Sequence, residues 1–150
     1  HLSGDDGAVQ IGVTWPSPRF SLMADTNCVR DNLTGLMWTR NMKFGAGTWD
    51  NQVQFCETLE YGGTNDWRMP NILELNSLVD YSRNGAPSLP TGHLFTNLVT
   101  ANVSFHTSTT DASNSGQSLF LSFWYSKNGT VGANAKSGSA YVWPVRGGSR

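Results

Sequence analysis

Apolar residues recur at helical spacing in the middle of the chain. Trp49, Val53 and Cys56 follow one another at intervals of four and three residues, so they share one face of a helix predicted from residue 49 to about 60. Thr48 stands immediately before this run and is a favourable N-cap, because its hydroxyl can accept a hydrogen bond from the first turn. The pattern therefore indicates an amphipathic helix with Cys56 on its inner face.

A second helix is predicted from about residue 71 to residue 80. Pro70 cannot donate a backbone hydrogen bond and disfavours helical angles at the residue before it, so an extended segment must turn here. Asn71 can cap the helix that follows, and Glu74 can reach back to the Asn71 backbone. This arrangement is a capping box, which marks a helix N-terminus.

The other apolar positions alternate with polar ones or form short runs, as in β-strands. Residues 81–100 contain several Pro and Gly and few periodic apolar positions. We expect a long structured loop there, and such loops often carry binding residues. The predicted strands are two within Cys28–Arg40, around a turn at 32–35, and one each at Val103–Thr110, Ser118–Ser126 and Ala140–Arg146. A hairpin turn is predicted at Lys127–Thr130, followed by a polar, glycine-rich connection up to Ser139.

Length and composition narrow the fold class. The chain has 150 residues, of which 14% are charged, with six Trp and seven Phe. Such a composition is typical of a loop-rich β or α+β domain. We expect residues 1–14 to be a flexible lead-in from an upstream segment and residues 15–150 to form a single domain. No run of 18 apolar residues is present, so the sequence predicts no membrane-spanning helix.

The two cysteines, Cys28 and Cys56, are too few for a structural zinc site. A disulfide between them would close a loop of about 29 residues and stabilise the fold by roughly 3–4 kcal/mol in the chain-entropy estimate. It would also imply an oxidising compartment. We predict this bridge, with two buried thiols as the alternative.

The net charge of −1 predicts no polyanionic partner, but its distribution is uneven. Residues 1–80 carry five basic and ten acidic side chains, whereas residues 81–150 carry five basic side chains and one acidic side chain. If the second half forms one face, that face is basic and attracts anionic ligands. The residues predicted to bind the ligand there are Arg83, Lys127, Lys136 and Arg150.

Four other charged residues are predicted to be structural. Asp66, Arg68 and Glu74 lie beside a Trp and a run of apolar residues, so we expect them to pair with one another or with neighbouring backbone groups. Arg146, in the last predicted strand, is a candidate partner for an acidic residue of the first half.

The chain carries no arrangement of residues that predicts catalysis or metal binding. His93 and His106 have no Glu, Asp or Cys at ligand spacing, and Asp111 is the single acid among residues 81–150, too few for a calcium site. No nucleophile elbow, phosphate-binding loop or nucleic-acid module is present. We therefore predict no enzyme activity, no cofactor, no metal ion and no nucleic-acid partner.

Several segments together resemble the DUF1566 family, in the order of that family and from residue 15 to residue 148. The resemblance rests on Trp15–Phe20, Asp31–Trp38, the helix that begins at Trp49, Trp67–Asp80, Ser108–Thr110 and Val142–Gly148.

This resemblance implies a C-type-lectin-like α+β fold, with two helices packed on antiparallel sheets and a long-loop region that presents the ligand site. It also implies a domain of a collagen-like bacterial adhesin, secreted or on the cell surface, that forms a homotrimer and binds sulfated glycosaminoglycans. The calcium-dependent sugar motifs of C-type lectins are missing, so we expect binding without calcium. The catalytic cysteine pair of the related formylglycine-generating enzymes has no match in residues 81–150.

A second hypothesis is a protein-recognition or structural module with an aromatic contact surface at Trp124 and Tyr125. Salt distinguishes the two. Polyanion binding should weaken steeply as ionic strength rises, whereas an aromatic contact should change little.

Overall fold

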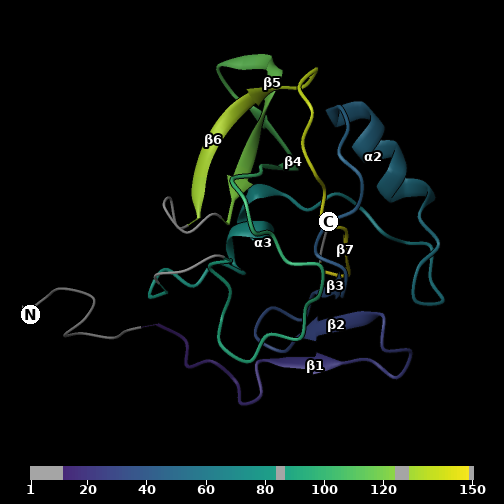
Figure 1. Cartoon of the computed structure of the whole chain (residues 1–150), viewed down its shortest axis with the longest axis vertical. Coiled ribbons are helices and arrows are strands. Elements are labelled where there is room, and N and C mark those ends of the chain that lie inside the picture. Colours follow the sequence, from purple (N-terminus) through teal and green to yellow (C-terminus); the bar gives the residue numbers. More distant parts are fainter. Residues whose placement is uncertain (1–11, 84–86, 124–128, 149–150) are drawn as a thin grey trace, which may run out of the picture.

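The computed structural model describes residues 12–83, 87–123 and 129–148. Within these ranges the chain forms two antiparallel sheets and two helices (Figure 1), which confirms the α+β class. The four-stranded sheet has the order β1-β2-β3-β7 and the three-stranded sheet the order β4-β5-β6. The elements are β1 (Phe20–Leu22), β2 (Cys28–Asp31), β3 (Met37–Thr39), α2 (Trp49–Thr58), α3 (Ile72–Asn76), β4 (Phe105–Asp111), β5 (Asn114–Ser122), β6 (Thr130–Ala135) and β7 (Val145–Arg146).

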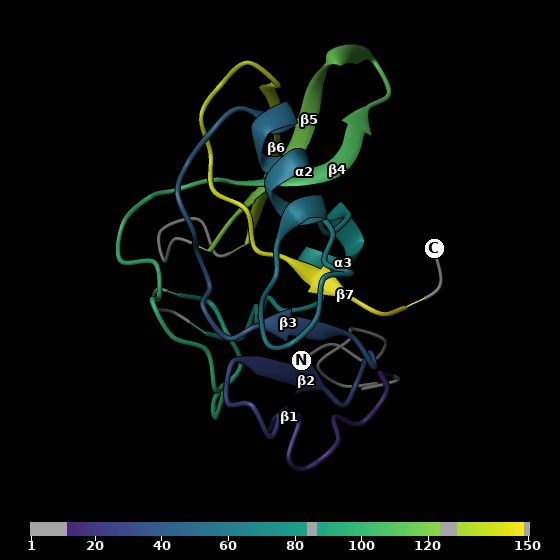
Figure 2. The same cartoon turned by 90° about the vertical axis from the view of Figure 1, so that its right-hand side faces the viewer.

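The two sheets lie towards opposite ends of the molecule, with α3 between them and α2 along one side (Figures 1 and 2). The long connection from α3 to β4 runs down towards the four-stranded sheet and returns (Figure 1). No helix of the described residues is long and apolar enough to cross a membrane.

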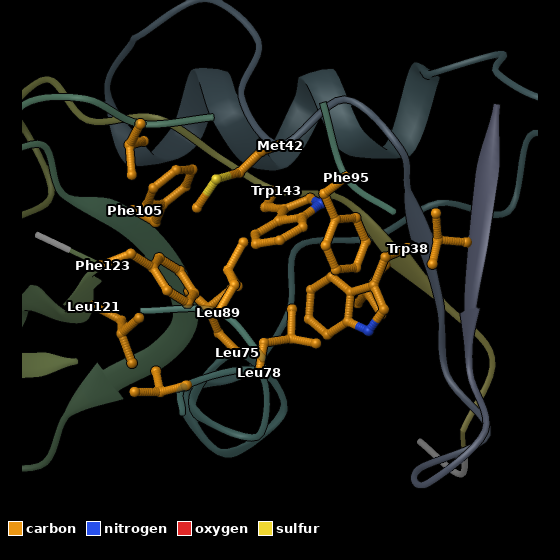
Figure 3. Close-up of a cluster of buried hydrophobic side chains, with 14 of the residues drawn as sticks. Trp38, Met42, Leu75, Leu78, Leu89, Phe95, Phe105, Leu121, Phe123 and Trp143 are labelled. Atoms are coloured by element: carbon orange, nitrogen blue, oxygen red, sulfur yellow. The ribbon is translucent and has the colours of Figure 1, made fainter. Parts of the chain in front are cut away.

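The core fills the space between the sheets, and Trp143 is at its centre (Figure 3). Its ring centroid lies 4.6 Å from that of Phe95, 5.4 Å from Trp38 and 5.7 Å from Phe123. The indole N–H donates to the Thr39 carbonyl at 3.0 Å, so the one polar atom of this buried side chain is satisfied. Trp143 thereby joins both sheets and the long connection in one apolar cluster.

Both helices begin where the sequence predicts. Thr48 caps α2 by accepting from the Asn51 N–H, and both hydrogen bonds of the Asn71–Glu74 capping box are present at α3. However, α3 ends at Asn76, four residues earlier than predicted. The Ser77 carbonyl, which a longer helix would direct to the N–H four residues on, accepts instead from Arg19 Nη2 at 2.7 Å.

The strand predictions are confirmed in part. The hairpin within Cys28–Arg40 is present as β2 and β3, but the last strand is limited to β7, because Pro144 lacks the N–H that would continue the ladder. The segment predicted as a polar connection contains β6, which pairs with β5 over six residue pairs. Its Thr, Gly, Ala and Asn side chains lack the alternation that predicts a strand.

The N-terminal arm is anchored by a buried ion pair. Arg19 Nε and Nη2 each lie 3.2 Å from an Asp31 carboxylate oxygen, and the two side chains are 5% and 0% exposed. Asp31 also accepts from the Leu33 N–H and the Thr34 hydroxyl, and the Trp15 ring covers the Arg19 guanidinium at 4.3 Å. This pair joins the arm, β2 and the end of α3.

The predicted disulfide is wrong, because both cysteines are buried free thiols. Cys56 on α2 packs in a small apolar cluster with Met69 and Val142. The Cys28 thiol instead donates to Asp25 Oδ2 at 3.6 Å, beneath the loop at Gly62. The two side chains therefore have different surroundings, although the helix does place Cys56 on its inner face as predicted.

Candidate functional site

The described basic residues fall into two sets. Three of them form ion pairs with carboxylates: Arg19 with Asp31, Arg68 with Glu74 and Arg146 with Asp66. The other described basic residues have no carboxylate partner among residues 12–83, 87–123 and 129–148, and these are Arg30, Arg40, Lys43, Arg83 and Lys136.

The Arg68–Glu74 pair is bidentate, with distances of 2.8 and 2.6 Å, and Arg68 Nη2 also donates to the Gly147 carbonyl at 2.8 Å. Burial acts to raise the pKa of Glu74, but hydrogen bonds from Arg68 and from the Asn71 N–H, together with the charge of Arg68, outweigh it, so the pKa is lowered. The pair thus ties the start of α3 to the C-terminal segment.

We expect acid to destabilise the domain in part through Glu74. Its pKa in the folded state lies below the ordinary value of 4.5, so the ionised carboxylate stabilises the fold above that pH and the contribution is lost as pH falls through the folded-state pKa. Urea unfolding from neutral pH to about pH 3 should show a smaller loss of stability for Glu74→Gln than for the unmodified chain. Equal losses would contradict this assignment.

Arg146 pairs with Asp66, an acid of the first half, at 2.6 Å. The hydrogen bonds from Arg146 and the Thr64 hydroxyl lower the pKa of Asp66 against a smaller opposing effect of burial. This pair is more exposed than Arg68–Glu74, since 55% of the Asp66 side chain is accessible. Arg146 therefore has a carboxylate partner in the first half of the chain.

Three of the unpaired cations gather along one loop, residues 91–98. Arg83 Nη1 donates to the Thr91 hydroxyl at 2.9 Å, Arg40 Nε to the Leu94 carbonyl at 3.1 Å and Lys43 Nζ to the Leu98 carbonyl at 3.4 Å. We call Arg83, Arg40 and Lys43 the basic strip. Each side chain is half-buried, and each guanidinium or ammonium retains N–H groups that no described residue occupies.

The backbone explains why Arg40 and Lys43 reach this loop. The Thr96 N–H donates to the Arg40 carbonyl, and the Met42 N–H donates to the Thr96 carbonyl. The Asn97 amide then donates to the Lys43 carbonyl at 2.8 Å. Residues 40–43 therefore run beside residues 96–97, so their basic side chains are placed by contacts across more than 50 positions of sequence.

Lys136 lies in a different place. Its ammonium group stands 4.4 Å from the centroid of the Trp49 ring and donates to the Thr110 hydroxyl at 3.0 Å. Its backbone N–H donates to the Gly116 carbonyl beside the start of β5. This position is next to the first turn of α2, where Trp49 is the first helical residue.

Arg83 and Lys136 stand at opposite ends of β5. The loop of Arg83 is joined to the end of β5 through Ser88, whose N–H donates to the Phe123 carbonyl, while Lys136 follows the Gln117–Ala135 pair. Gln117 and Phe123 are six residues apart along this extended segment, roughly 20 Å. The structure thus does not bring these two predicted ligand residues together.

The remaining predicted binding residues, Lys127 and Arg150, lie outside the described residues, as do Trp124 and Tyr125 of the aromatic hypothesis. The sequence did not reveal Arg40 and Lys43 as partners of Arg83. They belong to the acidic half of the chain, and only the pairing with residues 91–98 places them on the loop that Arg83 also contacts.

The two histidines considered as candidates are placed differently from each other. His93 stacks on Phe95 in the loop of residues 91–98, and burial and the Arg83 charge lower the pKa of His93. His106 is buried on β4, with Nε2 facing the carbonyls of Gly47 and Gly138. Among the described residues, no three His, Cys, Asp or Glu side chains come together as a metal site.

Comparison with known proteins places the chain in a family. The family model described as the Lcl C-terminal domain matches residues 27–146, which include every described strand except β1, both helices and the basic strip. No curated protein matches the chain. The match agrees with the resemblance recognised in the sequence. The chain therefore belongs to the Lcl C-terminal domain family.

Proposed function

We propose that this adhesin-related domain binds sulfated glycosaminoglycans, and that the basic strip is the main contact. The observation that supports the proposal most strongly is the gathering of three cations without carboxylate partners along residues 91–98. In the proposal, Lys127 and Arg150 remain candidate additions to this surface, and Lys136 forms a separate, weaker contact.

The chemistry of the strip suits a sulfated chain. Sulfate is a fixed anion, which Arg and Lys bind through charge-assisted hydrogen bonds. The loop already holds the guanidinium groups of Arg40 and Arg83 and the ammonium group of Lys43 through hydrogen bonds. These side chains therefore lose less conformational entropy when the ligand binds. The net charge of −1 does not prevent sulfate binding. Salt screens the repulsion between the sulfate groups and acidic side chains that lie far from the strip.

The proposal extends to assembly and location. We infer a C-type-lectin-like domain of a secreted or surface-bound adhesin that acts as a homotrimer. A trimer would present the basic strip three times to one polymer, and linked sites raise the apparent affinity by about 100- to 10,000-fold when the geometry permits simultaneous contact. Binding would need no calcium and no cofactor, and the domain would have no enzyme activity.

Heparin binding tests the proposed function. We expect the folded domain to bind at about 0.05 M salt and to lose most of that affinity by about 0.3 M, because the Debye length shortens over this range. EGTA should leave binding unchanged, and heparin stripped of sulfate should not bind. A folded sample that ignores heparin at low salt, or needs calcium to bind it, would contradict the proposal.

A further inference from the structure

A second site lies on the face of the four-stranded sheet that points away from the core. A pocket of about 260 Å³ opens there. Its walls include three sulfur-bearing side chains and one carboxylate, namely those of Met23, Met37, Cys28 and Asp25. None of these residues belongs to the basic strip.

The fold brings the three sulfur-bearing residues to one pocket. Met23 and Cys28 are the two ends of the turn between β1 and β2, where the Met23 N–H donates to the Cys28 carbonyl. On the neighbouring strand, Met37 pairs with Arg30 while Cys28 pairs with Thr39. Residues 28 and 37 are therefore diagonal neighbours on the same face of the sheet, a distance that long side chains bridge.

One carboxylate, that of Asp25, lies beside the thiol. Asp25 Oδ2 accepts from the Cys28 thiol at 3.6 Å, and Asp25 has no ion pair among the described residues. Arg146 also lines the pocket, donates to the Met37 sulfur at 3.6 Å and pairs with Asp66.

Gly62 covers the thiol, and only glycine fits this position. Its φ of +60° is a left-handed conformation, and a Cβ there would collide with the Cys28 sulfur and lie 2.5 Å from Asp25 Oδ2. Burial, the negative charge of Asp25 and the hydrogen bond to it raise the pKa of the Cys28 thiol to about 11.

We propose that this pocket binds a soft monovalent metal ion, Cu⁺, through the Cys28 thiolate and the thioethers of Met23 and Met37. Thiolate and thioether ligands select Cu⁺ over the harder divalent cations. Binding exchanges one proton for one metal ion: the S–H bond of Cys28 breaks, an S–Cu bond forms, and the proton leaves to solvent with no change of oxidation state. Asp25 stays outside the ligand set and stabilises the added positive charge.

The chain contains its own internal controls. Of its four methionines, Met23 and Met37 line the pocket, whereas Met42 and Met69 are buried in the two apolar clusters. Of its two cysteines, Cys28 lines the pocket and Cys56 is enclosed with Met69. The experiment titrates Ag⁺, a redox-inert substitute for Cu⁺, into chain labelled at the methionine methyl groups and follows the NMR signals.

The proposal predicts saturation at one Ag⁺ per chain, with shifts of the Met23 and Met37 methyl signals while those of Met42 and Met69 stay in place. Cys28→Ser should lose more than about tenfold in affinity, since removing even a supporting partner typically costs that much, while Cys56→Ser should retain it. The wild-type methyl pattern decides the question even if a cysteine variant fails to fold. No saturable shift, or shifts centred on Met69, would overturn the proposal.

Discussion

Asp31→Ala should lower the free energy of unfolding by about 3–5 kcal/mol, the usual cost of removing one partner from a buried ion pair. The substitution leaves the Arg19 guanidinium, whose side chain is 5% exposed, without its counter-ion. It also removes the acceptor for the Leu33 N–H and the Thr34 hydroxyl. Urea unfolding at neutral pH measures the change.

Asp66→Ala provides the matched control for this prediction. It removes a carboxylate from the ion pair with Arg146, but more than half of the Asp66 side chain is exposed. Exposed pairs contribute no more than about 1 kcal/mol, so the control should unfold close to the unmodified chain. If both substitutions lower the free energy of unfolding by the same amount, burial is not the reason that the Arg19–Asp31 pair stabilises the fold.

Trp143→Ala should cost about 3–5 kcal/mol, as for other large aromatic side chains removed from a packed core. Trp143 is fully buried and contacts aromatic rings from both sheets and from the connection between α3 and β4. Its removal also leaves the Thr39 carbonyl without its donor. Because this residue holds the long connection in place, the basic strip should lose order as well.

Trp15→Ala is the corresponding control with the same change of side chain. Trp15 is 44% exposed, and its main contact is the face-on approach of Arg19. A partly exposed cation–π contact contributes about 0.5–1 kcal/mol. Urea unfolding measures the free energy of unfolding of both variants. If Trp15→Ala loses as much stability as Trp143→Ala, then Trp143 is not at the centre of the stabilising core.

Local chemistry made some parts of this fold predictable. The caps at Thr48 and at Asn71–Glu74 depend on residues within four positions of one another, so the sequence displays both partners. The α3 terminus was not predictable in this way. Beyond that terminus the Ser77 carbonyl accepts from Arg19, 58 positions away.

Long-range contacts also explain what the sequence did not reveal about the site. The charge balance of the two halves pointed to a basic face in the second half, but Arg83 and Lys136 stand at opposite ends of β5. The cations beside Arg83 come from residues 40–43, because backbone pairing with Thr96 and Asn97 brings that segment across. Similarly, the sequence placed Cys28 on a strand and Cys56 on the inner face of a helix, and we predicted a bridge between them. In the structure Cys28 contacts Asp25, and Cys56 packs with Met69.

The most direct test of the central claim is to compare heparin affinity at low salt for two double variants that remove equal charge. Arg40→Gln with Lys43→Gln alters the basic strip, and the glutamine amides can still donate to the loop carbonyls. Arg30→Gln with Lys136→Gln removes two other cations that have no carboxylate partner among the described residues, of which Lys136 is the weaker contact proposed above. At about 0.5–1 kcal/mol per contact, the strip variant should bind about tenfold more weakly, and the control should change by less than about threefold. Equal losses, or a larger loss in the control, would contradict the strip as the polyanion site.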